Sequence, residues 1–262
     1  MRIPITCVPC TQMTPRPAYC TYDMPVGNSC TYELTCDLGH ETTTIIQNSQ
    51  FEVIFESGIS SLKDDYFREA VFNFAVALER FYEYGILYVL REQMQDPVTY
   101  RWGETGLDNY QALWATMSKQ SERQVGAFYA LYLKEFNEAA PVFNKSWLIK
   151  NTGLVLTLNG KSVETSEFRN KVVHQGYIPT KAEAILYGEC VNKYIHHILN
   201  KFMAINGHIS LTTAMDIERH LGAMQYKGSR QRWFTGISTF IASVQESYLC
   251  RPASLYELFT KH

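Results

Sequence analysis

The stretch that decides the fold is SLKDDYFREAVFNFAVALERFYEYGILYVLREQM, residues 61–94. Its apolar side chains recur at steps of three and four residues, which places them on one face of a helix. They are Ala70, Phe74, Ala77, Leu78, Phe81 and Leu87. The sequence therefore predicts a long helix with a wide apolar face, beginning at about residue 59.

Further helices are expected on both sides of a turn-rich segment. Residues 107–140 have apolar side chains at helical steps, and Pro141 is expected to end this helix because proline cannot continue one. Those side chains are Leu113, Met117, Phe128, Leu131 and Tyr132. The segment SWLIKNTGLVLTLNGKS (146–162) is β-branched and rich in turn residues, so it predicts a loop or small hairpin. The tail from residue 209 is expected to hold one or two more helices, one of them over 233–249.

Two capping signals start helices in the second half of the chain. Thr165 is expected to cap a short helix. Thr180 and Glu183 have the spacing of a capping box, which predicts the start of another long helix. The apolar face of that helix comprises Ile185, Val191, Ile195, Ile198, Leu199 and Phe202.

The bulk composition is that of a packed globular protein. The 262-residue chain is 46% hydrophobic, and its formal net charge of −2 gives no overall basic field, so any nucleic-acid contact has to use a local patch. The sequence shows neither a signal-peptide core nor a membrane-spanning apolar run, so we expect a cytoplasmic protein without membrane contact. We expect a mainly α fold, divided into a cysteine-rich module (1–55), a helical domain (56–208) and a helical C-terminal extension (209–262).

The cysteine-rich module has paired ligand spacings. CVPC (7–10) supplies Cys7 and Cys10, and CDLGH (36–40) supplies Cys36 and His40. Two such hairpins provide the four ligands of a tetrahedral zinc site. Because all four positions would be filled by protein, the zinc would be structural, and it would stabilise a segment with little core of its own. Short strands such as TYELTC are expected around it.

Alternatives to this ligand set stay open. Cys20 and Cys30 lie in the same segment and either could replace a ligand. The cysteines could also be free and buried, or CVPC could be a redox pair, although such pairs usually lie in a βαβ setting that is not evident here.

The stretch EFRNKVVHQGYIPTKAEA (167–184) combines Arg169, Asn170 and His174. An arginine and a histidine at this spacing are expected about once by chance in this chain, so the spacing alone is no evidence. Asn170 and His174 are four residues apart, however, and a helix places them on the same face. Gly176 and Pro179 are expected to end the helix just after the histidine, which places His174 at a helix–loop–helix corner.

RNKVVH followed by glycine, proline and a long helix resembles the R-x4-6-H motif of the HEPN superfamily, in its RN-x3-H form. The upstream segment REAVFNFAVALERFYEY is similar to the first long helix of HEPN domains. The resemblance covers roughly residues 60–205 and is nearest to HEPN proteins of phage-defence and abortive-infection systems, several of which have an N-terminal cysteine-rich module, here zinc-ribbon-like. It implies a HEPN-type helical bundle and a metal-independent endoribonuclease.

The chemistry that the resemblance implies matches the residue types. RNA supplies its own nucleophile, the 2′-hydroxyl, so the enzyme needs a proton shuttle and a group that stabilises negative charge. His174 would be the general base or acid, and Arg169 would hold the phosphate oxygens. Asn170 would orient either the histidine or the phosphate by hydrogen bonding. The expected products are a 2′,3′-cyclic phosphate and a 5′-hydroxyl. Since one motif offers one histidine, we expect a homodimer with a shared site.

Other residues are weaker candidates for RNA contact. Tyr177 could stack on a base, although a plain corner aromatic is equally compatible. KGSRQRWF (227–234) interleaves Arg230 and Arg232 with Trp233, as RNA-binding surfaces do, although a solvated helix entrance with core aromatics is slightly favoured. In YIHHILN, one of His196 and His197 is expected to face solvent while the other packs.

Two other function classes remain open. A non-catalytic HEPN module would bind RNA or a partner protein without cutting, and a zinc-dependent adaptor would bind protein only. A toxin or defence nuclease would also be expected to have an antitoxin or another protein regulator.

Overall fold

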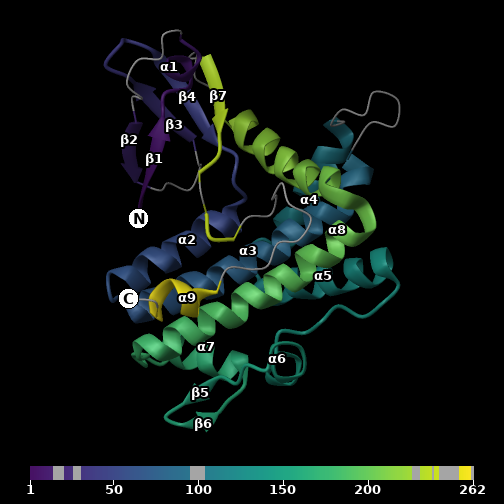
Figure 1. Cartoon of the computed structure of the whole chain (residues 1–262). Coiled ribbons are helices and arrows are strands. Elements are labelled where there is room, and N and C mark those ends of the chain that lie inside the picture. The colour runs from purple at the N-terminus through teal and green to yellow at the C-terminus, as the bar shows by residue number, and fades with distance from the viewer. Residues whose placement is uncertain are drawn as a thin grey trace.

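The computed structural model describes residues 1–13, 21–25, 31–94, 104–225, 231–237, 239–241 and 254–260, and its fold over these residues is mainly helical, as predicted (Figure 1). A small group of strands near the N-terminus lies beside the helices. No helix in the described part of the chain is long and apolar enough to cross a bilayer.

The centre of the molecule is the helix that the opening stretch predicts. Residues 61–94 contain α3 (Phe67–Met94), which packs against α2 (Gln50–Lys63), α5 (Ser121–Phe136) and α8 (Lys181–Gln225). All six predicted apolar residues of α3 are buried. The ring of Phe74 lies against Gly58 of α2 and Gly188 of α8, where an added Cβ would come within 2.5 and 2.6 Å of the ring. These glycines let three helices approach one another closely.

Several predicted helices are divided or end earlier than expected. The helix expected from residue 59 is interrupted between α2 and α3, where Asp65 has a φ of 58°. The stretch 107–140 forms α4 (Glu104–Met117) and α5 rather than one helix. Pro141 does not end α5: Asn137 does so, in a left-handed conformation, with its N–H bonded to the carbonyl of Leu133.

The turn-rich segment 146–162 is part helix and part hairpin. Asn144 accepts a hydrogen bond from the N–H of Trp147 and caps α6 (Lys145–Thr152), which ends at Gly153. The predicted hairpin follows as β5 (Thr157–Leu158) and β6 (Lys161–Ser162). The Asn159–Gly160 turn between them has positive φ at both residues, as tight hairpins require.

The two helices of the Arg–Asn–His stretch are present. The short one is α7 (Thr165–His174), but Thr165 does not cap it: the cap residue is Glu164, and the Thr165 hydroxyl donates to the carbonyl of Phe143 instead. The capping box before α8 is confirmed, since Thr180 N–H donates to Glu183 at 2.8 Å and Glu183 N–H donates to Thr180 Oγ1 at 3.3 Å. The predicted apolar face of α8 is buried.

Apart from the β5–β6 hairpin, the described strands form two small sheets. β1 (Arg2–Thr6) pairs antiparallel with β2 (Thr21–Pro25), and the short helix α1 (Val8–Gln12) follows β1. β3 (Thr31–Thr35) pairs antiparallel with β4 (Glu41–Ile46). On the other edge of β4 lies β7 (Gln231–Thr235), in parallel orientation, so a segment after α8 returns to the N-terminal strands (Figure 1).

The strand β7 corrects the prediction for the tail. A helix over 233–249 was expected, yet Trp233 and Phe234 lie in β7, and Phe234 is 44% exposed rather than in the core. Asn48 also holds the segment after β7 against the N-terminal region. Its side chain accepts a hydrogen bond from the N–H of Ile237 and donates one to the carbonyl of Ile237. The last described helix is α9 (Leu255–Thr260), whose first N–H donates to the buried carboxylate of Glu189 on α8.

Candidate functional site

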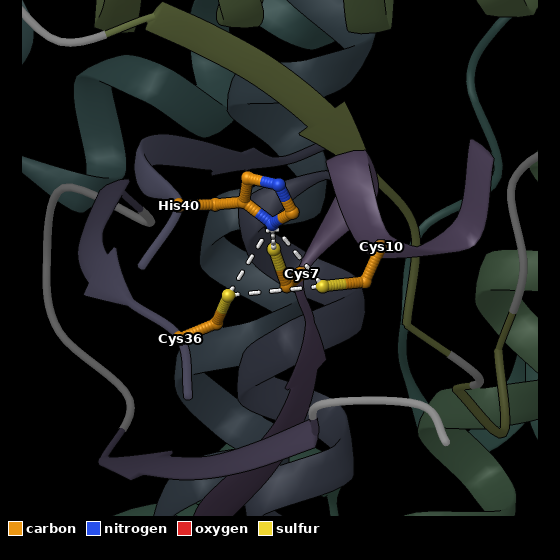
Figure 2. A group of neighbouring side chains, drawn as sticks. All are labelled: Cys7, Cys10, Cys36 and His40. Atoms are coloured by element: carbon orange, nitrogen blue, oxygen red, sulfur yellow. Dashed lines mark hydrogen bonds between the residues drawn. The ribbon is translucent and has the colours of Figure 1, made fainter. Parts of the chain in front are cut away.

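The four predicted metal ligands come together at one point of the strand region (Figure 2). Cys7 lies between β1 and α1, Cys10 is in α1, Cys36 follows β3 and His40 precedes β4. Their ligand atoms all lie within 4.8 Å of one another, and the three cysteines are buried. Each half of the C-x2-C and C-x3-H pattern thus contributes one side of the cluster.

The spacing of these atoms fits a tetrahedral metal. Tetrahedral zinc with sulfur at about 2.3 Å and nitrogen at about 2.0–2.1 Å places sulfurs about 3.8 Å apart and sulfur about 3.5 Å from nitrogen. The Sγ atoms of Cys10 and Cys36 are 3.7 Å apart. His40 Nδ1 lies 3.8, 3.3 and 3.4 Å from the Sγ atoms of Cys7, Cys10 and Cys36. The buried Cys3His group could therefore hold a metal ion such as zinc.

The turn between Cys36 and His40 shapes the second half of the cluster. The N–H of Gly39 donates to the carbonyl of Cys36 at 2.8 Å, and Gly39 has a φ of 80°, which favours glycine. Burial alone would raise the pKa of the Cys36 thiol, but hydrogen bonds with the backbone of His40 and Leu38 and with the neighbouring thiols lower that pKa to about 6. The thiolate, which is the metal-binding form, is thus favoured at this ligand. Cys20 and Cys30 lie outside the described residues.

The second candidate site is at the C-terminal end of α7. Arg169 Nη1 lies 3.0 Å from Asn170 Oδ1, to which it donates, and 3.1 Å from His174 Nε2. Gly176, with a φ of 74°, ends the helix directly after this group. Val172 is buried beneath it and fixes α7 to the core, whereas Asn170 and His174 are exposed. The three predicted catalytic side chains therefore meet on an open surface that a large substrate can reach.

Two residues of α3, which the sequence did not suggest, also contact α7 at this group. Glu79 Oε1 accepts from Arg169 Nη2 at 2.8 Å, and Arg68 Nε donates to the carbonyl of Val172 at 3.2 Å. Glu79 lies 90 residues from Arg169 in the chain, so no local spacing pairs them. The one sequence feature that could have suggested Glu79 is that it is a carboxylate within ALERF (77–81), close to the apolar positions Leu78 and Tyr82 of the same helix.

The remaining substrate-binding candidates lie elsewhere or have other partners. The Tyr177 hydroxyl is 3.1 Å from both carboxylate oxygens of Glu183, and burial together with that carboxylate raises the pKa of Tyr177. Arg232 and Trp233 are in β7, which lies far from α7 in Figure 1. Arg230 is outside the described residues. Among the described residues, the hydrogen bonds of Arg169 and His174 thus do not include Tyr177, Arg232 or Trp233.

No protein-family model, curated protein sequence or solved structure shows a significant match to this chain. The assignment that its residues support is a mainly helical protein with an N-terminal Cys3His cluster that could bind a metal ion.

Proposed function

We propose that the chain is a metal-independent endoribonuclease of the HEPN type, acting as a toxin or an antiviral defence effector. The observation that supports this most directly is the contact of Arg169 with His174 at 3.1 Å on an exposed surface. A cation that can bind a phosphate, next to an imidazole that can move a proton, is the minimum that RNA cleavage by its own 2′-hydroxyl needs.

In the proposed reaction, Nε2 of His174 takes the proton of the 2′-hydroxyl, and the freed oxygen attacks the adjacent phosphorus. The bond from phosphorus to the 5′-oxygen breaks, and that oxygen takes up a proton from a general acid. Arg169 stabilises the charge on the non-bridging oxygens, and Asn170 holds the guanidinium through its Oδ1. The products are a 2′,3′-cyclic phosphate and a 5′-hydroxyl, and no metal takes part.

The general acid in this proposal comes from a second copy of the chain. Each chain has one such motif and so one histidine at this place, whereas a base and an acid are needed on opposite sides of the phosphorus. A homodimer in which two α7 helices face each other would supply both, once the second His174, displaced from Arg169 by the phosphate, has taken up a proton from solvent. The zinc-binding module would be structural and would offer a surface for RNA or for a protein regulator such as an antitoxin.

The direct test is cleavage of RNA in EDTA-containing buffer by wild type and by His174→Ala. We expect wild type to cut and leave cyclic phosphate ends, detected by mass spectrometry, and the variant to lose at least about 100-fold in rate. His197→Ala is the matched control, because His197 is an exposed histidine on α8 away from this group. If His174→Ala cuts as fast as wild type, the proposed site is wrong.

One observation favours a second candidate, a HEPN module that binds RNA or a partner protein without cutting it. Glu79 compensates the charge of Arg169 at 2.8 Å, which lowers the attraction of Arg169 for a phosphate. RNA retention or partner binding by wild type, without cleavage at any protein concentration, would support this candidate over the nuclease.

A further inference from the structure

We infer that Glu79 is a positioning residue of the Arg169–His174 site. Glu79 fixes the guanidinium of Arg169, and Arg169 in turn holds His174 in the protonation state of a base. A phosphate that binds to the guanidinium displaces His174 and frees it to act. The inference rests on the proposed function for its kinetic consequence. Its structural part concerns only the protonation state and orientation of His174, so it can be measured whether or not the chain cleaves RNA.

The contact with Arg169 identifies which ring nitrogen of His174 has the proton. Arg169 Nη1 lies 3.1 Å from His174 Nε2. A guanidinium has only donors and is always protonated, so Nε2 has to be the acceptor. The imidazole is then neutral, with its proton on Nδ1 and its Nε2 lone pair directed at Arg169. This is the tautomer that a general base acting through Nε2 requires.

Glu79 and Asn170 keep Arg169 in this place. Its side chain is long and 30% exposed, so without a partner it would sample many rotamers. Glu79 belongs to the central helix α3, and its carboxylate is 26% exposed and 2.8 Å from Arg169 Nη2. With Nη2 held by Glu79 and Nη1 held by Asn170 Oδ1, the rigid plane of the guanidinium is fixed at both ends. The remaining N–H of Nη1 then meets His174.

The site would switch on when a phosphate binds to Arg169. At rest the Nε2 lone pair is occupied by Arg169, so it cannot take a proton from a hydroxyl. An anionic phosphate oxygen is a stronger acceptor for a guanidinium than a neutral imidazole nitrogen, because the Coulomb attraction between opposite charges adds to the hydrogen bond. A phosphate that takes over Nη1 therefore frees Nε2 beside the substrate. Binding of the substrate and release of the base become a single event.

Glu79 has effects of opposite sign on RNA binding and on the rate of cleavage. The carboxylate of Glu79 lies in contact with the group that has to bind a phosphate, so it repels RNA while it orients Arg169. Glu79→Gln removes the charge but keeps an oxygen that can accept from Nη2. It should therefore tighten RNA binding, and because a neutral amide oxygen holds Arg169 less firmly than a carboxylate does, it should also slow the chemical step. Glu79→Leu removes the acceptor as well, and the orientation of Arg169 with it.

The kinetic test compares wild type, Glu79→Gln and Glu79→Leu in single-turnover cleavage of one RNA oligonucleotide, with binding measured by fluorescence anisotropy. We expect Glu79→Gln to lower Kd several-fold, and Glu79→Leu to lower the cleavage rate about ten-fold or more, as is typical when a hydrogen bond to a charged group is lost. Glu69→Gln is the control, since it removes an exposed carboxylate from the same helix two to three turns away. A merely structural role for Glu79 would not lower Kd.

The structural test is nitrogen NMR of the His174 ring in wild type and Glu79→Leu, with His174→Ala used to assign the signals. Wild type should show a proton on Nδ1 and none on Nε2 at neutral pH, and Glu79→Leu should shift the ring toward the Nε2-protonated tautomer. An unchanged tautomer together with an unchanged cleavage rate in a folded Glu79→Leu protein would overturn the inference. If wild type does not cleave RNA, the proposed function fails, and the ring signals alone decide the role of Glu79.

Discussion

Two adjacent histidines on α8 show how burial sets the charge of a single residue. His196 is only 4% exposed, and its Nε2 is buried without a hydrogen-bond partner. Burial, with a smaller effect from the Lys193 ammonium, lowers the pKa of His196 to about 4. His197 is exposed, in agreement with the prediction that one of the pair packs and the other faces solvent. His196 is therefore neutral in the folded protein at any pH near 7.

This difference predicts that acid destabilises the fold through His196. The unfolded chain gains a proton at this residue as pH falls below about 6.5, while the folded chain does not until about pH 4, so stability is lost across that window. With a shift of roughly 2.5 units, the full loss is about 3 kcal/mol in the free energy of unfolding. Urea unfolding of wild type and His196→Gln, at several pH values from 7 to 4, measures it.

The expected result is a smaller loss of stability with falling pH in His196→Gln than in wild type. His197→Gln is the comparison: burial lowers the pKa of His197 as well, but by less than that of His196, so this variant should change the pH dependence less than His196→Gln does. Parallel curves for wild type and His196→Gln would show that His196 titrates normally in the folded state, contrary to the prediction.

At the same scale, the sequence predicted the contact partners that lie close in the chain and missed those that do not. Asn170 and His174 share a face of α7 by helical periodicity, and the structure brings both to Arg169. Glu79 is on another helix, and only the packing of α3 against α7 places it there. Long-range pairs of this kind leave no periodic signal in a single sequence.

At the scale of elements, periodicity predicted the helices well and the strand β7 not at all. α3 and α8 show long apolar repeats, so their existence follows from sequence. Helix ends depend on residues in left-handed conformations, such as Asp65 between α2 and α3 and Asn137 after α5. β7 is a five-residue strand whose hydrogen-bonding partner, β4, lies about 190 residues earlier. The pairing of Trp233 with Thr44 is a tertiary effect that no local pattern of QRWFT reveals.

The cysteine cluster lies beside a small core that β1, β3, β4 and α2 share, and removing one of its ligands tests the metal proposal. Replacing Cys10 with serine removes one of four ligands, and the ligand set then no longer closes around the ion. We expect about one zinc per wild-type chain and almost none in Cys10→Ser, measured by elemental analysis of the purified protein. Thermal unfolding should begin at lower temperature in the variant, because the binding free energy of a structural metal contributes to folding.

Cys190→Ala is the matched control for this experiment. Cys190 is a buried cysteine of α8 outside the cluster, and burial raises the pKa of its thiol to about 12, so it is a poor metal ligand at neutral pH. Its replacement should leave the zinc content unchanged. Equal zinc content in Cys10→Ser and wild type would mean that another residue, such as Cys20 or Cys30, completes the site.

At the scale of the whole molecule, three exposed apolar side chains lie on α3, just before it, and just after α7, and α3 packs against α7. Arg68, Phe72 and Glu79 recur on one face of α3, and Arg68 binds the last turn of α7. An ion pair between Lys181 and Asp65 brings the start of α3 to the start of α8. In this region Tyr66 is 62% exposed, Phe72 48% and Ile178 75%. These three apolar side chains are the surface that we expect a second copy of the chain to cover in the proposed dimer.

Replacing Phe72 and Ile178 together with aspartate should therefore convert the dimer into a monomer. Two carboxylates cannot be buried against a second copy without a large desolvation cost, so the assembly is lost while each exposed position tolerates the charge in the monomer. Light scattering coupled to size-exclusion chromatography would report a halved mass. Leu133→Asp is the control, because Leu133 is 53% exposed on α5, away from this surface, and should leave the mass of the dimer unchanged.

A shared site makes a second demand on the same dimer. If cleavage needs His174 from both copies, a mixed dimer of wild type and His174→Ala has one histidine and should be almost inactive. Refolding wild type with excess His174→Ala should then suppress cleavage far below the value set by dilution, whereas refolding it with the monomeric Phe72→Asp, Ile178→Asp variant should not. Activity that falls only in proportion to dilution would mean that each chain cleaves on its own, and the general acid would then have to be sought within one protomer.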